Sequence, residues 1–436
     1  MDSDTQSTSE TATGRRGFLR AAGAVGAFTI LKPHLVRGSA ANSAVRVGLL
    51  GCGRRGSTDA NNIAQNTEAR IVALADLFDD QLAKAKQRFD KLAESKGYAG
   101  IVQTFRGPKA CQQLMDSKDV DAMVIATPAY FHPEHLAAAV AAGKHVYCEK
   151  PVAVDVAGAK RVLETGKKAA GRLSLDIGFQ IRSAPPFVEL VRRIQGGALG
   201  EIAAGEAHYY SPAPEQRAWT SSGETLRLRN WIQDRVLSGD IIVEQNIHVL
   251  DICNWVLQGH PLKAVGRGGR NGRSGKLDWP GDDCHSHFDV VFEYANGVHV
   301  SFNSVQFGKG PFEASERFFG TRGASQSPYS GVLGITGEEA WTWAGSDRPV
   351  DGAFSSSGSF SDNLAQADPE KQKAFINSIS SGQFHNQAAD GVEAALTAML
   401  GRKAAYTGRG VTWDEMLRSN EHWDSRIDVS KLPPEP

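Results

Sequence analysis

The chain has 436 residues, with 48 Lys and Arg against 49 Asp and Glu and a formal net charge of −1. This length exceeds one ordinary domain, so we expect two. Charges of both signs are scattered along the sequence, which excludes an electrostatic footprint for nucleic acid or an anionic membrane and favours a small, near-neutral partner.

The first 41 residues predict an export signal. Arg15 and Arg16 precede a modest apolar run at 21–31 and small residues around Ala40 and Ala41. This pattern is typical of a cleaved twin-arginine signal, and a basic amphipathic helix is the alternative.

A permanent membrane span needs about 20 apolar residues, more than the apolar run at 21–31 has. We therefore expect a periplasmic or secreted protein that meets the twin-arginine translocase during export, without a stable membrane span.

A glycine-rich loop follows the first predicted strand, where the sequence reads G-C-G-R-R-G at 51–56. The spacing G-x-G-x-x-G is typical of dinucleotide-binding loops. Gly51 allows the tight turn, Gly53 lets the backbone approach a pyrophosphate, and Gly56 lets the next helix pack closely. The N–H groups at the start of that helix face the phosphates.

The next strand, at 70–76, ends in Asp76, where a ribose hydroxyl would be accepted. A carboxylate there repels a 2′-phosphate, so Asp76 favours NAD. Arg54 and Arg55 can bind the pyrophosphate or approach a 2′-phosphate, which leaves NADP open.

Strands and helices alternate over 44–178, which predicts an α/β Rossmann domain with a doubly wound parallel sheet. Its later elements are expected as strands at 120–127, 145–148 and 173–178 and a helix at 135–142. From 179 to 427 we expect a substrate-binding and oligomerisation domain of the α+β class, with a large, mainly antiparallel open sheet. Its elements are expected as helices at 184–195, 369–380 and 391–406, strands at 201–210, 262–269, 285–294, 298–307 and 317–320, a hairpin turn at 295–297 and a long loop at 346–365. Residues 428–436 are expected to form a loose tail.

The segment C-E-K-P at 148–151 is the first candidate for catalysis. It follows a strand at the carboxyl edge of the parallel sheet, where ligands bind in such folds. Lys150 is expected to point toward the nicotinamide. The alternative is that Glu149 and Lys150 form a surface ion pair.

The second candidate is the segment 239–251, which is predicted to open an apolar helix. Glu244 and His248 are four residues apart, so both can project from one helical face and form a hydrogen bond. A carboxylate beside an imidazole supports proton transfer to or from a hydroxyl. The alternative is an acid at a helix N-terminus and a histidine buried in the core.

The sequence D-D-C-H-S-H at 282–287 resembles a metal site, but we expect none. On a strand, His285 and His287 share one face while Cys284 and Ser286 share the other, so the ligands diverge. The five cysteines are widely spaced and odd in number, which predicts mostly free, buried thiols. No G-x-S-x-G sequence supports a serine nucleophile.

Several polar and aromatic residues would suit a sugar, because they offer flat faces and partners for hydroxyl groups. A role in the core or in a loop fits each of them equally well. These candidates are Gln180, Arg182, Asn230, Trp231 and Asp251.

Four segments together resemble the Gfo/Idh/MocA oxidoreductases, a family named for glucose–fructose oxidoreductase and inositol dehydrogenase. They are G-C-G-R-R-G at 51–56, A-T-P-A-Y-F-H at 126–132, E-K-P at 149–151 and E-Q-N-I-H-V-L-D at 244–251. The sequence A-A-Y-T-G at 404–408, with V-T-W-D-E at 411–415, extends the resemblance to nearly the whole exported chain. The chain is similar to a branch of the family that is exported by the twin-arginine route.

The resemblance implies a Rossmann domain, a second domain on an open antiparallel sheet, and dimers or tetramers formed through that sheet. It implies that Lys150 and His248 serve the reacting hydroxyl together with the acid four residues before the histidine. That acid is Asp in many members and Glu244 here, and the usual asparagine after Thr-Pro is Ala129 here. It also implies cofactor contacts by Thr127, Pro128, His132, Glu149 and Lys150.

These observations predict reversible hydride transfer between a sugar, glycoside or polyol carbon and a tightly bound NAD. His248 would take the hydroxyl proton, Glu244 would hold His248, and Lys150 would stabilise the alkoxide. An alternative is an NAD-dependent glycoside hydrolase that works by transient oxidation, elimination, water addition and re-reduction. A non-catalytic sugar or nucleotide binder is a further alternative.

Overall fold

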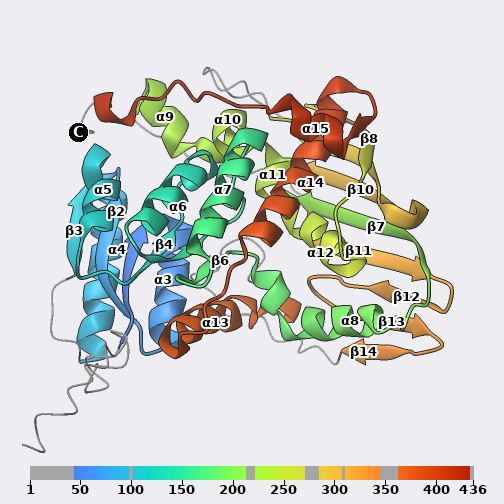
Figure 1. The fold of residues 1–436 in the computed structure, drawn as a ribbon, viewed down its shortest axis with the longest axis horizontal. Helices are drawn as coiled ribbons and strands as arrows, with labels where there is room; N and C mark the ends of the chain where they lie inside the picture. Colours follow the sequence, from blue (N-terminus) through green and yellow to red (C-terminus); the bar gives the residue numbers. More distant parts are fainter. Residues whose placement is uncertain are drawn as a thin grey trace, which may run out of the picture. The chain divides into compact units, whose positions relative to one another are not determined.

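The computed structural model describes residues 44–97, 102–212, 221–270, 284–306, 310–343 and 362–432, and residues 44–436 fall into one compact unit. The predicted signal at 1–41 and most of the predicted loop at 346–365 lie outside the described residues. Two sheets organise the compact unit (Figure 1). They correspond to the two predicted parts of the chain.

The first sheet is parallel throughout, with the strand order β3-β2-β1-β4-β5-β6. Its strands are β1 (Arg46–Leu50), β2 (Arg70–Asp76), β3 (Gln103–Arg106), β4 (Ala122–Ile125), β5 (His145–Cys148) and β6 (Leu175–Ile177). This order reverses direction between β1 and β4, and ligands bind outside the carboxyl ends of the strands at such a point. The predicted doubly wound Rossmann sheet is confirmed.

Helices connect these strands on both faces of the sheet. They are α3 (Arg54–Asn66), α4 (Asp79–Ser95), α5 (Ala110–Asp116), α6 (His132–Ala141) and α7 (Val156–Ala169), with short 3₁₀ turns η2 (Gly107–Lys109) and η3 (Ala129–Phe131). One helix from the far end of the chain joins them: α13 (Ala367–Ser381) packs Phe375 and Ile376 into the same apolar cluster as β1, β2 and α3. The C-terminal part of the chain therefore helps to build the Rossmann core.

The second sheet has nine strands in the order β14-β13-β12-β11-β7-β10-β9-β8-β15. They are β7 (Ile202–Ser211), β8 (Lys263–Gly269), β9 (His287–Glu293), β10 (His299–Gln306), β11 (Glu313–Gly320), β12 (Gly323–Gln326), β13 (Leu333–Gly337), β14 (Trp341–Trp343) and β15 (Val411–Thr412). Only β7 and β10 pair in parallel, so the sheet is mainly antiparallel, as predicted. The hairpin turn predicted between β9 and β10 is present as η6 (Ala295–Gly297), with φ of 60° at Asn296 and 74° at Gly297.

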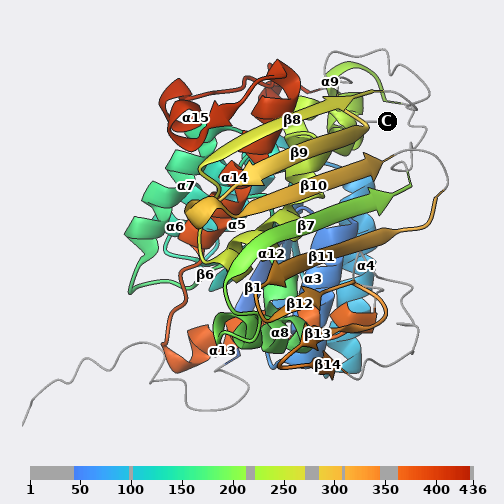
Figure 2. The same cartoon turned by 90° about the vertical axis from the view of Figure 1, so that its right-hand side faces the viewer.

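The helices of this part are α8 (Pro185–Gln195), α9 (Gly223–Arg229), α10 (Arg235–Ser238), α11 (Ile241–Glu244), α12 (Ile247–Leu257), α14 (Ala388–Thr407) and α15 (Trp413–Ser419), with η4 (Gln180–Ser183), η5 (Trp231–Gln233), η7 (Asp362–Leu364) and η8 (Val429–Lys431). Helices α12 and α14 pack against one face of the sheet, and Figure 2 views its other face, where no helix lies in front of the central strands. The sheet is therefore open on one side, as expected.

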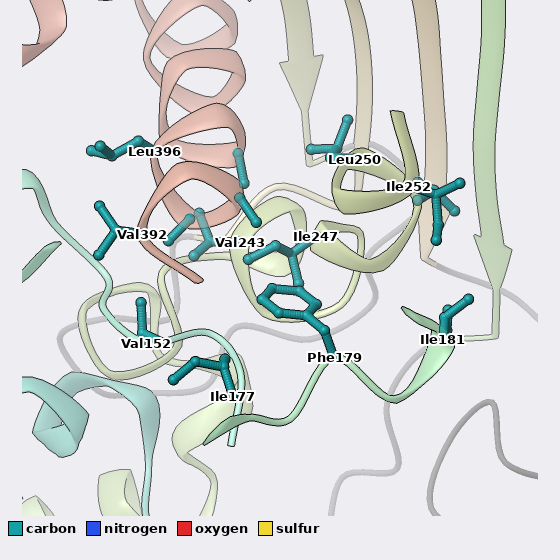
Figure 3. Close-up of a cluster of buried hydrophobic side chains, with 14 of the residues drawn as sticks. Val152, Ile177, Phe179, Ile181, Val243, Ile247, Leu250, Ile252, Val392 and Leu396 are labelled. Carbon is teal, nitrogen blue, oxygen red and sulfur yellow. The ribbon is translucent and has the colours of Figure 1, made fainter. Parts of the chain in front are cut away.

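A continuous apolar cluster joins the two sheets. Figure 3 shows Ile177 and Phe179, at the end of the parallel sheet, beside Val243 and Ile247 of the helices that line the second sheet, with Val392 of α14 close by. Burying such side chains stabilises the fold by about 1.5–3 kcal/mol each. This packing holds the ends of β5 and β6 against α11 and α12.

The predicted loose tail is partly wrong. Residues 428–432 are described, and Val429–Lys431 form η8, where Asp428 accepts hydrogen bonds from the N–H and hydroxyl of Ser430.

All five cysteines are free thiols, four buried and Cys111 half-buried, which confirms the prediction of mostly free, buried thiols. Among the described residues, no helix has the length and apolar character needed to cross a membrane.

Candidate active site

The glycine-rich loop makes two close backbone contacts that side chains would prevent. Gly51 has φ of +93°, and a Cβ there would lie 2.6 Å from the carbonyl oxygen of Ala126. A Cβ at Gly56 would lie 2.2 Å from the carbonyl oxygen of Gly51. The first and third glycines therefore play the parts predicted for them, a tight turn and close packing of α3.

The second glycine leaves open space. A Cβ at Gly53 would meet no protein atom within 4 Å, and Gly53 and Arg54 line a groove of about 810 Å³ along the carboxyl ends of β1 and β2. Helix α3 starts at Arg54 without a side-chain cap, so the N–H groups of its first turn lack an intrahelical partner. This loop fits the pyrophosphate of a dinucleotide.

Asp76 lines the same groove at the end of β2. One of its carboxylate oxygens accepts the N–H of Cys52 at 2.6 Å, and the other accepts the N–H of Phe78 at 2.8 Å. These bonds fix the carboxylate beside the glycine-rich loop. Its place and its charge fit a ribose with free hydroxyl groups and repel a 2′-phosphate, which favours NAD.

Arg55 forms a buried ion cluster. Its guanidinium contacts Glu149 at 3.0 Å, Asp368 of α13 at 2.6 and 2.9 Å, and Asp59 at 3.2 Å. These three carboxylates hold the side chain that we expected to reach the pyrophosphate or a 2′-phosphate. Burial raises the pKa of Asp59 well above its ordinary value, and the positive charge of Arg55 opposes this shift.

His132 connects the loop after β4 to the loop after β5. Its two ring nitrogens lie 2.7 Å from the carbonyl oxygens of Thr127 and Pro151. Thr127 lines both the groove and the smaller pocket described next, and Pro128 lines the groove. The family segment around 126–132 thus lies at the nucleotide site, with His132 connecting it to the turn after Lys150.

A smaller pocket of about 260 Å³ opens beside the groove, and Lys150, Glu244 and His248 line it together. Residues Gly53, Arg54 and Thr127 line both spaces, so the two are continuous. The Nζ of Lys150 donates to the carbonyl oxygen of Glu244 at 2.6 Å and lies 3.2 Å from its Oε1. Lys150 is therefore held by the second part of the chain, and the surface ion pair between Glu149 and Lys150 is not what the structure contains.

The helix predicted from 239 onward is broken, and this changes the role of Glu244. Helix α11 ends at Glu244 and α12 begins at Ile247. The N–H of Asn246 bonds to the carbonyl of Ile241, five residues back, and the N–H of His248 bonds to that of Gln245 at 3.4 Å. The break leaves the carbonyl oxygen of Glu244 to accept from Lys150. Such local π-type irregularities are frequent at functional sites.

As a result, the predicted hydrogen bond between Glu244 and His248 is not formed. The Oε2 of Glu244 and the Nδ1 of His248 are both buried without a protein partner. Burial, and then the positive charges of Lys150 and Arg55, lower the pKa of His248 well below its ordinary value. His248 is therefore a neutral imidazole at physiological pH, which is the protonation state of a base.

The residues that we considered for a sugar separate into two groups. Gln180 and Trp231 line the small pocket, and the Oε1 of Gln180 is buried without a protein partner. Arg182 and Asp251 instead form a bidentate ion pair at 2.8 Å, and neither lines the pocket or the groove. Asn230 follows the last residue of α9, and its side-chain amide donates to the carbonyl of Leu226. Only Gln180 and Trp231 lie where a substrate would.

Other lining residues had no counterpart among the predictions. Tyr209 projects from β7, where alternating burial could have identified the inward face, and Ile232 and Gln245 complete the small pocket. Phe78 and Arg229 line the groove, and so do Ile427, Asp428, Val429 and Ser430. No local sequence signal marks these last segments, because they reach the groove only through the tertiary fold.

Residues 284–287 line neither this pocket nor the groove. Asp282 and Asp283 fall outside the described residues, and the ring of His285 stacks on Tyr406 at 3.8 Å. Within the described residues, no three or more His, Cys, Asp and Glu side chains are grouped to hold a metal ion.

Comparison with known proteins gives two family matches along the chain. Residues 45–177 match the oxidoreductase family model with an NAD-binding Rossmann fold, and residues 187–326 match the GFO/IDH/MocA C-terminal domain. Together these matches cover more than half of the chain.

Individual relatives agree with these matches. The chain is 29% identical to inositol 2-dehydrogenase of Acidothermus cellulolyticus, over 69% of this chain and 78% of that enzyme. It is 28% identical to inositol 2-dehydrogenase 4 of Saccharopolyspora erythraea, over 84% of this chain and 95% of that enzyme. Its fold is similar to that of a levoglucosan dehydrogenase solved with NADH and levoglucosan, with a TM-score of 0.66 at 19% identity over 85% of this chain and 99% of that one. The chain belongs to the Gfo/Idh/MocA family of NAD-binding oxidoreductases.

Proposed function

We propose that this protein is an NAD-dependent dehydrogenase that oxidises a hydroxyl group of a sugar, glycoside or polyol. The observation that carries the proposal is the small pocket continuous with the nucleotide groove, where Lys150, Glu244 and His248 meet. Three of its lining residues, Gln180, Glu244 and His248, have buried polar atoms without a protein partner. Such atoms cost free energy unless a ligand supplies hydrogen bonds, which suits a substrate with several hydroxyl groups.

The side chains have separate tasks in this reaction. Bound NAD supplies the hydride acceptor. Lys150 donates a hydrogen bond to the substrate oxygen and stabilises the alkoxide that develops on it. The neutral ring of His248 accepts the hydroxyl proton. Glu244 holds and charge-balances Lys150, and the burial of the pocket keeps these interactions strong.

A panel of inositols, monosaccharides, anhydrosugars and glycosides offered with NAD tests the proposal. We expect at least one of them to reduce NAD, with NADH absorbance rising in proportion to ketone product. The variants Lys150→Ala and His248→Ala should each lower kcat by about 100-fold or more, in the range of a general acid or base. Arg182→Ala, which changes a side chain outside the pocket, should lower kcat far less. NADH formation that survives both pocket variants would contradict these roles.

A redox-neutral glycoside reaction is the second candidate. The export signal predicted at 1–41 favours it, because an exported enzyme cannot rely on a soluble NAD pool and needs a cofactor that stays bound through the cycle. Transient oxidation of a glycoside acidifies the neighbouring C–H, permits elimination and water addition, and ends with return of the hydride. Glycoside cleavage without added NAD and without net NADH would support it. Stoichiometric NADH formation would exclude it as the main activity.

We further propose export by the twin-arginine route, on the basis of Arg15 and Arg16. The double variant Arg15→Lys, Arg16→Lys should stay in the cytoplasmic fraction, whereas the wild type should appear, shortened, outside it. Equal distribution of both proteins would contradict the proposal.

A further inference from the structure

The nucleotide groove has a second wall that comes from outside the Rossmann fold. One wall contains Asp76 at the end of β2, Phe78 just after it, and Gly107 directly after β3. The other contains Arg229, at the end of α9, and Ile427, Asp428, Val429 and Ser430, near the end of the described chain. In a doubly wound sheet the region after β2 and β3 receives the adenosine half of a dinucleotide. The second wall therefore faces the adenosine half.

The C-terminal segment, residues 421–432, is tied down before it reaches the groove. The N–H of Trp423 donates to Oδ2 of Asp155 at 2.7 Å, and the N–H of Ser425 donates to the hydroxyl of Tyr130 at 3.3 Å. The buried side chain of Arg227 donates to the carbonyl of Ser425 at 2.8 Å. These bonds connect the segment both to the Rossmann part and to α9, so its path along the groove is built by specific contacts.

Arg229 makes a second bridge to the Rossmann part. Its Nη1 lies 2.7 Å from Oδ1 of Asp80, and its Cζ lies 3.8 Å from the centre of the Phe78 ring. The Arg229 side chain is only 6% exposed. A charge stacked on an aromatic ring and paired with a carboxylate in a partly desolvated place is held firmly. Arg229 thus fixes the position of Phe78 beside Asp76.

We propose that Arg229 and the C-terminal segment form a clasp over the adenosine half of the bound dinucleotide, and that this clasp keeps NAD in the protein between turnovers. This inference rests on the proposed function in one respect, that the ligand of the groove is an adenine dinucleotide. Release of the ligand requires the clasp to open, so the clasp acts on the dissociation rate more than on the association rate. In this proposal the glycine-rich loop binds the pyrophosphate, whereas Arg229 of α9 and residues 427–430 hold the adenosine half.

The rate at which NADH dissociates tests the clasp without any substrate. It is measured from the change in NADH fluorescence after the NADH complex is diluted into excess NAD. A chain that ends at Arg426 lacks the part of the segment that lines the groove, and a chain that ends at Leu432 is its matched control. We expect the first to release NADH at least 10-fold faster than the full chain and the second to release it at the same rate as the full chain. The amount of nucleotide that remains after gel filtration, measured by mass spectrometry of the denatured protein, should be equal in the full chain and the chain ending at Leu432. It should be lower in the chain ending at Arg426.

Arg229→Ala gives an independent readout that leaves the C-terminus intact. It should also speed NADH release, whereas Arg106→Ala, which removes an exposed arginine paired with Asp79, should not. Unchanged release from both the Arg426 truncation and Arg229→Ala would overturn the clasp. A wild-type chain that binds no NADH would instead contradict the proposed function itself.

Discussion

At the residue scale, the pairing of side chains differs from what their spacing in the sequence indicated. Sequence motifs placed Lys150, Glu244 and His248 in one site, and the structure brings all three to one pocket. Their spacing also predicted a bond between Glu244 and His248, whereas Glu244 pairs with Lys150. The i,i+4 rule assumes a regular helix, and the one-residue shift at Asn246 removes that assumption. A local break of this kind has no clear signal in a single sequence.

The protonation of His248 provides a test of this pairing. Burial, and then the charges of Lys150 and Arg55, lower its pKa. Lys150→Met removes one of these charges, so the imidazolium becomes less unfavourable and the pKa of His248 should rise. Histidine ¹⁵N NMR over a pH series measures it, with the signal assigned by its loss in His248→Asn.

Lys84→Met removes an exposed lysine far from the pocket and should leave the His248 titration unchanged. A His248 pKa that is the same in wild type and Lys150→Met would show that the two side chains do not interact as described.

At the element scale, long and strongly patterned segments were predicted well and short ones were not. The predicted strand at 201–210 nearly coincides with β7, and the helix predicted at 391–406 lies within α14. Strands β12 and β14 were missed, since four residues of sequence G-A-S-Q and three of W-T-W carry too few positions to show alternation. Hydrogen bonds to the neighbouring strands β11 and β13 stabilise these two short strands, whose own residues only weakly favour a strand.

One strand carries a buried acid whose titration affects stability. Glu316 in β11 is completely buried, its Oε2 accepts the hydroxyl of Ser327 at 2.7 Å, and burial raises its pKa from 4.5 to about 8. The folded protein therefore keeps a proton that the unfolded chain loses near pH 4.5. The stability from this group is present below pH 4.5 and is lost as pH rises to about 8.

Glu316→Gln should remove this dependence on pH. The free energy of unfolding of the variant relative to wild type should increase from pH 5 to pH 8 by a few kcal/mol, at about 1.4 kcal/mol per pKa unit. Urea unfolding at the two pH values measures the change. Glu313→Gln, at a largely exposed site of the same strand, is the control and should show little change. A relative stability of Glu316→Gln that is equal at pH 5 and pH 8 would contradict the prediction.

At the scale of the whole molecule, the two-part organisation follows from the sequence, but the connections between the parts do not. The change from alternating strands and helices to antiparallel strands marks the two sheets. The ion pair between Arg55 and Asp368 and the approach of residues 427–430 to the groove join segments hundreds of positions apart, and nothing local predicts them. The nucleotide loop was therefore recognisable from sequence, while its second wall was not.

The open face of the nine-stranded sheet is the surface that we expect to form oligomers. Val265 and Val291 are cross-strand partners on β8 and β9, and they are 47% and 42% exposed. Apolar side chains side by side on an open sheet favour burial against a second copy. Val291→Glu should shift the protein to a smaller species in sedimentation velocity, and Val188→Glu, with the same 42% exposure on α8, should not. Identical sedimentation of wild type and Val291→Glu would contradict this surface assignment.

The central claim is that hydride passes between a carbon of a hydroxylated substrate and NAD held beside Lys150 and His248. Mass spectrometry of the nucleotide after turnover of a fully C-deuterated sugar or polyol substrate tests it most directly, because the label reports transfer whether or not NAD is released. We predict one deuterium in the reduced nucleotide from wild type and at least 100-fold slower labelling in His248→Ala. NADH that forms together with the product but carries no deuterium would contradict the account.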